Sequence, residues 1–492
     1  MYKLSRCLVL SDICNLEKKL IFKTDRYVSR YNGSDGSDPI KTSQAKPYES
    51  ISDYYAGKSV FVTGGTGFLG KVLIERLLFN CSDIESIYVL IRGKKGLKSE
   101  NRLQQMLDVP VFDKLKALKP SALKKIIPIE GDITKPNLDI KTSDEQQLID
   151  NVSVVFHSAA TVRFIESFED IMKINYEGTR KVMDLSKKMK NLQTFLYLST
   201  SFSNANKLVI DEMIYPKPKA IDEVYSFIDN NGDNPKATED FVNGYPNTYT
   251  LSKALCENYI EENHGTMKTI IVRPSIVAPV FKEPLPGWQD SWVAATATFS
   301  DIARGLTKVI YGGPNVICDM IPVDYVCNFI IVAGARGNPS DDVIVYNSCS
   351  SSSNPISWRR AADLYLKESL RHGKYELKPR QVELTTSKLK VDLLTLVLQT
   401  TPSFLADLWM RLKGESPKYL KMQERPVLLR DLLRFFTSTS YHIKSENSRK
   451  LIETLDERDK FLFPCDPRTI PWQTYMPLFC RGIQKYLLKP KH

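Results

Sequence analysis

Tyr249 and Lys253 stand four residues apart in a segment whose apolar residues have helical spacing. That separation places both side chains on one face of a helix. A tyrosine hydroxyl, with an ordinary pKa of about 10, transfers a proton at neutral pH only when a cation stabilises its phenolate. Lys253 can supply that cation. The upstream run Ser199-Thr200-Ser201 supplies hydroxyls that can polarise a carbonyl. These residues predict acid–base chemistry at a carbonyl group.

A glycine-rich turn follows the apolar run Val60-Phe61-Val62 and precedes a helical pattern. Gly65, Gly67 and Gly70 have the spacing in which one glycine makes the turn, one admits a pyrophosphate and one lets helix pack on strand. The helix N-terminus then offers free N–H groups to the phosphates. We therefore expect a dinucleotide to bind at Thr63, Gly64, Gly65, Thr66, Gly67, Phe68, Leu69 and Gly70.

Arg92 ends the second strand, about 22 residues after Gly70, where it would meet the adenosine ribose. Sites that prefer NAD place an acidic residue there to bind the ribose 2′-hydroxyl. A guanidinium instead suits a 2′-phosphate, and Lys94 and Lys95 follow closely. The pattern predicts NADPH as the cofactor. The alternative is a loop charge that only faces solvent.

The elements that must position these residues alternate along the chain. Strand-like apolar runs occupy residues 60–62, 87–91, 126–132, 152–157, 195–199 and 269–273. Helical patterns occupy residues 100–107, 144–149, 170–190 and 248–263. This alternation predicts an α/β fold with a doubly wound parallel sheet of the Rossmann type. Ligands of such sheets bind beyond the carboxyl ends of the strands.

Three regions are predicted along the chain. Residues 1–50 are turn-rich and polar in part, and we expect a poorly ordered leader. Residues 51–375 form the NADPH-binding catalytic domain with its substrate-binding elements. Residues 376–492 form a smaller, mainly helical C-terminal domain.

Composition narrows the class of protein. The chain has 492 residues, 42% hydrophobic and 25% charged, as in soluble globular proteins. Its net charge of +11 favours acidic partners, such as nucleotide phosphates or an anionic membrane, and the absence of a nucleic-acid module argues against nucleic acid. Nine scattered cysteines without a Cys-x-x-Cys pair predict free thiols in a reducing compartment and no metal site. His157 is interpreted as a strand-end residue and not as a catalyst. No signal sequence is evident, so secretion is not expected.

The chain resembles the alcohol-forming fatty acyl-CoA reductases, the male-sterility group of the extended short-chain dehydrogenase/reductase superfamily, and its insect branch more than its plant branch. The resemblance runs from Gly57 to about Leu487. The matching motifs are residues 63–70, 128–134, 156–164, 249–253, 272–277, 282–288 and 319–324. Two of them, Pro284-Leu285-Pro286-Gly287-Trp288 and Ile321-Pro322-Val323-Asp324, are specific to this family within the superfamily.

The resemblance implies NADPH-dependent reduction of a long-chain fatty acyl-CoA to a primary alcohol, with release of CoA through an aldehyde. It implies catalytic roles for Thr200, Tyr249 and Lys253. It also implies that Asp132 and Ile133 lie at the adenine, Ala159 and Ala160 line the cofactor, Asn175 supports the active-site helix, and Pro274, Ser275 and Ile276 border the nicotinamide.

Two departures from the family pattern leave questions open. Ser199-Thr200-Ser201-Phe202 replaces the usual Ser-Thr-Ala-Tyr, so Ser201 competes with Thr200 for the hydroxyl role. Residues around Tyr441-His442-Ile443 replace an Asn-Glu-Trp signature, which leaves the chain-length specificity open. Two other functions stay as alternatives: a different extended reductase, acting on a sugar nucleotide or a steroid, and a non-catalytic lipid- or NADPH-binding protein.

The segment from Leu389 to Leu412 is mostly apolar, but its longest charge-free run is shorter than the roughly 20 residues that span a bilayer. Pro402 interrupts it, which predicts two short helices in a hairpin. The hairpin is either a buried core pair or an element on a membrane surface. Basic residues at both ends favour the membrane. We expect a membrane-associated protein that faces the cytosol, at the endoplasmic reticulum or the peroxisome.

Overall fold

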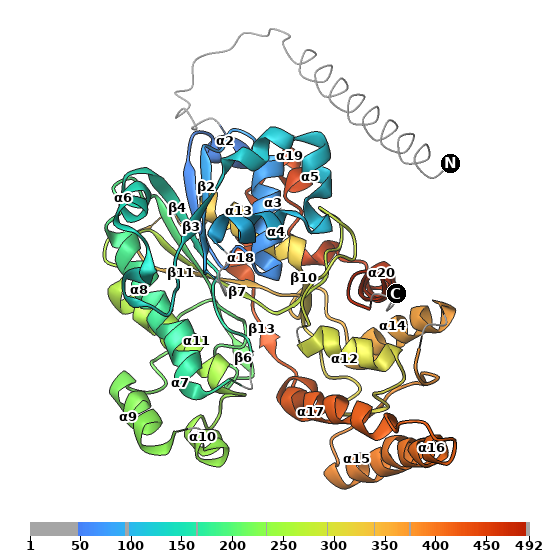
Figure 1. The fold of residues 1–492 in the computed structure, drawn as a ribbon. Coiled ribbons are helices and arrows are strands. Elements are labelled where there is room, and N and C mark those ends of the chain that lie inside the picture. Colours follow the sequence, from blue (N-terminus) through green and yellow to red (C-terminus); the bar gives the residue numbers. More distant parts are fainter. Residues whose placement is uncertain are drawn as a thin grey trace, which may run out of the picture. The chain divides into compact units, whose positions relative to one another are not determined.

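A seven-stranded parallel sheet forms the centre of the protein (Figure 1). The computed structural model describes residues 48–93, 98–163, 166–232, 234–292, 294–338, 340–372 and 375–488. The strand order is β11-β7-β5-β4-β1-β2-β3. The strands are β1 (Ser59–Thr63), β2 (Ser86–Ile91), β3 (Ile126–Glu130), β4 (Val152–His157), β5 (Thr194–Leu198), β7 (Thr269–Pro274) and β11 (Ile344–Ser348). The predicted doubly wound α/β fold is confirmed.

Strand β1 explains why the sheet is covered on both sides. Val60 and Val62 pack in one core cluster with helices α3 (Phe68–Asn80) and α13 (Val323–Arg336). Phe61 points the other way and packs with α8 (Glu177–Lys187) and α11 (Thr248–Asn263). Figure 1 shows these two helix layers on opposite faces of the sheet. Because both faces are buried, the strand is a continuous apolar run instead of an alternating one.

The strand order reverses between β1 and β4, which are neighbours in the sheet. From β1 the chain proceeds outward to β2 and β3, and from β4 it proceeds the other way. This switch point is where ligands of open α/β sheets bind. The six predicted strands all form. The seventh, β11, was not predicted, because its apolar run, residues 343–346, is short and ends at the polar Asn347.

Further helices surround the sheet and continue into the C-terminal part of the chain. They are α2 (Ile51–Tyr55), α4 (Ser99–Leu107), α5 (Asp113–Leu118), α6 (Thr142–Asn151), α7 (Phe168–Ile171), α9 (Ile221–Asn231), α10 (Pro235–Phe241), α12 (Ala294–Ala303), α14 (Trp358–His372), α15 (Lys388–Thr395), α16 (Thr401–Leu412), α17 (Tyr419–Ser438), α18 (Glu446–Glu453), α19 (Glu457–Leu462) and α20 (Trp472–Tyr486). Two five-residue π-helical turns are η4 (Met172–Tyr176) and η5 (Leu396–Thr400).

Three two-stranded sheets join segments that are distant in sequence. They are β8 (Ile276–Ala278) with β10 (Met320–Pro322), β9 (Val309–Tyr311) with β12 (Glu383–Thr385), and β6 (Val209–Ile210) with β13 (His442–Ile443). Two of the three pairs cross residue 375. Residues Ser50–His492 form one compact unit, and the domain boundary near residue 375 stays a prediction from sequence.

The predicted hairpin around Pro402 is wrong. Helices α15 and α16 are joined by the turn η5 into one helical segment, and the junction residues have helical backbone angles. Proline cannot donate to the carbonyl four residues earlier, and its ring clashes with that carbonyl. Here the wider π turn precedes Pro402, and the Lys308 ammonium donates to the Leu398 carbonyl at 2.9 Å. An amine from another element therefore replaces the hydrogen bond that the proline lacks.

Some predictions fall outside the described residues: nearly all of the leader (residues 1–47), Lys94, Lys95 and Phe164. Over the described ranges, no helix combines the length and apolar character needed to cross a bilayer. The seven cysteines of the same ranges are unpaired and buried.

Candidate active site

The glycine loop after β1 has no space for a side chain at Gly64 or Gly70. Gly64 has φ +75°, and a Cβ there would lie 2.8 Å from the Ala159 nitrogen. A Cβ on Gly70 would collide with the Gly64 carbonyl oxygen. Gly64 therefore adopts the turn conformation. This corrects the prediction, which gave the turn to one of Gly65, Gly67 and Gly70. The exposed backbone at the start of α3 fits a pyrophosphate.

His157 supports this loop from β4. Its Nδ1 lies 2.7 Å from the Thr63 hydroxyl and its Nε2 lies 3.0 Å from the Thr179 hydroxyl. Burial lowers the pKa of His157 to about 3, so the imidazole is neutral. The Thr63 hydroxyl also accepts a hydrogen bond from the Ala159 N–H at 3.3 Å. His157 joins the loops after β1 and β4, as its interpretation as a strand-end residue implies.

Helix α11 brings Tyr249 to the end of β5. The helix begins at the cap Asn247, whose side chain accepts from the Thr250 N–H at 3.0 Å. The side chains of Tyr249 and Thr200 share a hydrogen bond. The Ser201 hydroxyl instead donates to the Arg273 carbonyl at 2.7 Å. Of the two competing hydroxyls, the geometry therefore favours Thr200.

Lys253 lies on the same face of α11, one turn further on. Its ammonium donates to the Leu198 carbonyl at 2.7 Å and to the Tyr197 hydroxyl at 3.1 Å. Burial lowers the pKa of Lys253 to about 8. Burial also raises the pKa of the Tyr249 phenol, and the Thr200 hydrogen bond offsets this only in part. Lys253 was expected to lower the pKa of Tyr249, but in the protein alone burial has the larger effect. Tyr249 is therefore a neutral phenol that can donate a proton.

Asn175 contacts α11 from the π turn η4. Its side-chain nitrogen lies 3.0 Å from the Ser252 hydroxyl, and its side-chain oxygen accepts from the Thr161 N–H at 2.9 Å. The Asn175 carbonyl accepts from the Thr179 hydroxyl and the Cys256 thiol. Asn175 thus lies where a residue supporting the active-site helix is expected.

A buried ion pair behind the catalytic residues was not predicted. Arg273 on β7 and Glu257 on α11 form two hydrogen bonds, at 2.9 and 2.6 Å, and neither side chain is exposed. Arg273 also donates to the carbonyls of Asp211 and Met213, while Ser199 donates to Glu257. The pair therefore holds both ends of the loop that carries Thr200. The strand pattern showed only an arginine at a strand end.

Arg92 is exposed after β2, and a second arginine accompanies it. The Arg102 guanidinium on α4 donates to the Arg92 carbonyl, and the charge of Arg92 helps to lower the pKa of Arg102. Burial is the larger cause of that shift. The two arginines give this edge of the sheet a positive charge that suits an anion. Arg102 was not predicted, because a helical pattern does not show which side chain turns back to the sheet.

The other predicted cofactor residues also lie at the carboxyl ends of strands. Asp132 follows β3 and accepts from the Thr134 N–H at 2.9 Å. Ile133 packs against Gly178 on α8, where a Cβ would not fit. Ala159 and Ala160 follow β4, and Pro274 ends β7. Ser275 is 5% exposed, and its hydroxyl has no partner among the described residues. The cradle without Cβ atoms and this free hydroxyl fit a dinucleotide that runs from β2 to β7.

The family-specific motifs fold over the glycine loop. The ring of Trp288 lies 5.5 Å from that of Phe68, at the start of α3. The Lys71 ammonium lies 2.7 Å from Asp290 and also donates to the Thr66 carbonyl at 2.8 Å. The Asp324 carboxylate accepts from three consecutive N–H groups, those of Phe281, Lys282 and Glu283. Trp288 therefore contacts the glycine loop, and Asp324 fixes the segment that leads into the motif of Trp288, roles that the sequence did not indicate.

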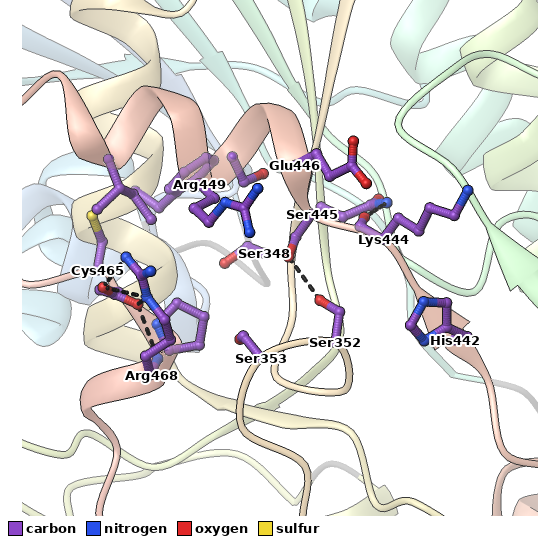
Figure 2. Close-up of a pocket in the computed structure, with 16 residues that line it drawn as sticks. Ser348, Ser352, Ser353, His442, Lys444, Ser445, Glu446, Arg449, Cys465 and Arg468 are labelled. Atoms are coloured by element: carbon purple, nitrogen blue, oxygen red, sulfur yellow. Dashed lines mark hydrogen bonds and ion pairs between the residues drawn. The ribbon is translucent and has the colours of Figure 1, made fainter.

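A cavity of about 210 Å³ lies next to the edge strand β11 (Figure 2). Ser348, Ser352 and Ser445 line it, together with residues of α18. Its lining includes none of Thr200, Tyr249 and Lys253. Two of its basic groups are engaged, Lys444 with Asp211 and Arg468 with Asp466, each at 2.8 Å. The cavity is therefore separate from the candidate catalytic residues.

Comparisons with known proteins agree with this architecture. Two family models, both described as male sterility protein, match residues 62–330 and 398–490. Fatty acyl-CoA reductase 1 of Xenopus laevis is 36% identical over 89% of this chain and 86% of its own length. The human protein of that name is 35% identical with the same coverage, and fatty acyl-CoA reductase 2 of Mus musculus is 32% identical.

Solved structures show the same fold at lower sequence identity. The reductase domain of a nonribosomal peptide synthetase from Mycobacterium tuberculosis has a TM-score of 0.60 at 16% identity, over 87% of this chain and 91% of that domain. The terminal R domain of the myxalamid PKS-NRPS pathway has a TM-score of 0.58 at 18% identity, over 89% and 93%. On the family models and the curated relatives together, the chain belongs to the fatty acyl-CoA reductase family of oxidoreductases.

Proposed function

We propose that this protein reduces a long-chain fatty acyl-CoA to the primary alcohol with NADPH and releases CoA. The observation that carries the proposal is the placement of Thr200, Tyr249 and Lys253 next to the dinucleotide cradle. The names of the relatives supply the substrate class. The two alternatives, a reductase for another substrate and a non-catalytic binding protein, lack such support.

The bound nicotinamide supplies hydride. Thr200 and Tyr249 stabilise the negative charge that develops on the thioester oxygen, and Tyr249 donates its proton to it. The charge of Lys253 stabilises the phenolate that remains. The hemithioacetal then loses CoA as its thiol and leaves an aldehyde. A second hydride and a second proton convert the aldehyde to the alcohol, so each acyl-CoA consumes two hydrides and two protons.

The preference for NADPH is assigned to Arg92, with Arg102 beside it. Arg92→Asp should weaken NADPH binding and narrow the preference over NADH by about one to three orders of magnitude, because a charge-assisted contact to the 2′-phosphate is replaced by repulsion. Fluorescence titration with both cofactors measures the ratio. Lys124→Asp, at the amino end of β3, is the control for net charge. An unchanged ratio would assign the phosphate to another residue.

The activity itself is tested with purified protein, palmitoyl-CoA and NADPH. We expect free thiol to appear together with hexadecanol, and two NADPH to be oxidised for each thiol. One NADPH for each thiol, with aldehyde in the medium, would contradict the second reduction. Turnover of a sugar nucleotide or a steroid instead would support the other reductase. NADPH binding without any turnover would support the binding protein.

A further inference from the structure

The helical segment 388–412 presents a row of large apolar side chains to solvent. Their exposed fractions range from 44% to 84%. This apolar stripe consists of Leu389, Leu393, Leu396, Val397, Phe404, Leu405, Leu408, Trp409 and Leu412. The residues recur at helical spacing, so they share one face. Contiguous exposed apolar surface of this kind marks an interaction site.

Polar residues on the opposite face fix the direction of the stripe. The buried Gln399 accepts from the backbone N–H groups of Lys308 and Val309, at 3.1 and 3.2 Å, and donates to Gln423 at 3.0 Å. The buried Asp407 accepts from three N–H groups at the start of α17, those of Lys418, Tyr419 and Leu420. Turning the stripe inward would leave these groups unpaired, which is costly. The segment is therefore held with its apolar face outward.

The two ends of the stripe are positively charged. Six exposed basic residues flank it: Lys388, Lys390, Arg411, Lys413, Lys418 and Lys421. Within the described part of the chain, none of the six takes part in an ion pair. Asp392 and Glu415 are the exposed acidic residues between Lys388 and Lys421. An apolar face with Trp and Phe and a basic border is the pattern of a helix that lies in the interface of an anionic bilayer.

We propose that the segment 388–412 docks flat on an anionic membrane, with the apolar stripe in the boundary between headgroups and acyl chains. A helix of this length extends about 37 Å, and it would lie along the surface. In Figure 1 the segment occupies the edge of the molecule beyond α17, so a flat surface can reach it. The proposal concerns where the protein binds and does not depend on the reaction.

Helix α17 connects the stripe to the catalytic residues. Its start is capped by Asp407 of α16, and its Phe436 ring lies 4.8 Å from the ring of Phe202. Phe202 follows Thr200 by two residues. If the proposed function holds, an acyl chain that leaves the bilayer at the stripe would meet this apolar contact next to the catalytic hydroxyl.

Flotation of the full-length protein with vesicles tests the docking. We expect wild type to float with vesicles of phosphatidylcholine and phosphatidylserine, and far less with phosphatidylcholine alone. Leu393→Ser, Val397→Ser, Phe404→Ser and Leu408→Ser, combined, should lower the partition coefficient at least tenfold. Leu118→Ser with Phe461→Ser is the matched control, because these two exposed residues lie on α5 and α19, away from the stripe. This control should float like wild type.

Removal of the positive charges and measurement of the oligomeric state complete the test. Changing Lys388, Lys413, Lys418 and Lys421 to Gln should remove the dependence on phosphatidylserine. Light scattering at the same concentrations identifies a second copy as the occupant: a wild-type dimer that the stripe variant converts to monomer would overturn the proposal. Wild type that stays with the soluble fraction would overturn it too. Reduction of a short, water-soluble acyl-CoA by the stripe variant should stay normal, which separates this proposal from the proposed function.

Discussion

Helix α11 and the segment 388–412 differ in how much of their surface is buried, yet both bury polar residues. Helix α11 contains several polar residues and is nevertheless buried over most of its surface, including Ser252, Lys253 and Glu257. The segment 388–412 is richer in apolar residues, yet its buried residues include Gln399 and Asp407. Each of these five buried polar side chains has a hydrogen-bond partner on another segment. Hydrogen-bonding partners, and not hydrophobicity alone, therefore decide which face turns inward.

In helix α11, loss of the Tyr249 hydroxyl should have the largest effect of all, and that effect is on turnover. Tyr249→Phe should lower turnover about 10²–10⁴-fold, because the proton donor is removed, while NADPH binding changes little. Steady-state kinetics and cofactor titration measure the two. Tyr245→Phe, at a half-buried position four residues earlier, should retain turnover. A folded Tyr249→Phe variant with near-normal turnover would contradict the assignment.

Glu257→Gln tests whether the buried polar residues of α11 depend on their partners. Arg273 would stay buried without its counter-charge, so the free energy of unfolding should fall by about 3–5 kcal/mol. Denaturant unfolding followed by circular dichroism measures this. Glu261→Gln, at an exposed position on the same helix, should change stability little. Equal stability of the two variants would show that the ion pair is dispensable.

The pH dependence of kcat/KM and of stability tests the role of Lys253. Its pKa of about 8 means that the ammonium loses its proton as the pH rises above 8, so kcat/KM should fall about tenfold per pH unit there. Between pH 8 and about pH 10.4, the ordinary pKa of lysine, this side chain holds more protons in the unfolded chain than in the folded protein. The free energy of unfolding should therefore rise with pH over that range. Lys253→Arg stays charged and should remove the alkaline fall. A fall that persists in this variant would point to another group.

In the segment 388–412, Gln399→Leu should have the smallest effect of these variants, and that effect is on stability. Leucine cannot accept from the N–H groups of Lys308 and Val309, so the free energy of unfolding should fall by about 1–3 kcal/mol although hydrophobicity rises. Thermal unfolding measures it, and Thr401→Leu, at an exposed position of the same segment, is the control. A more stable Gln399→Leu variant would contradict the importance of inward polar contacts.

The spacing of apolar residues along the chain was enough to predict individual helices and strands. Helix α11 covers residues 248–263 as predicted, and the six expected strands form where the sequence has short, mostly apolar runs. The placement of Thr200 beside Tyr249 followed from the order of strand and helix. What could not be predicted depends on distant partners. Lys308 donates to the carbonyl that Pro402 leaves without a partner, and Arg273 on β7 pairs with Glu257 on the adjacent helix α11. The choice between Thr200 and Ser201 needed the position of the Arg273 carbonyl.

The pairing of β6 with β13 has a consequence for the order in which the protein folds. Residues 209–210, just after the loop that carries Thr200, pair with residues 442–443. Tyr441 beside that strand packs on Phe202. A ribosome that has completed the whole parallel sheet, up to Ser348, has still to synthesise this partner. The sheet can therefore form early during synthesis, whereas the catalytic loop gains its last support only near the end, and contacts of such long sequence separation form slowly.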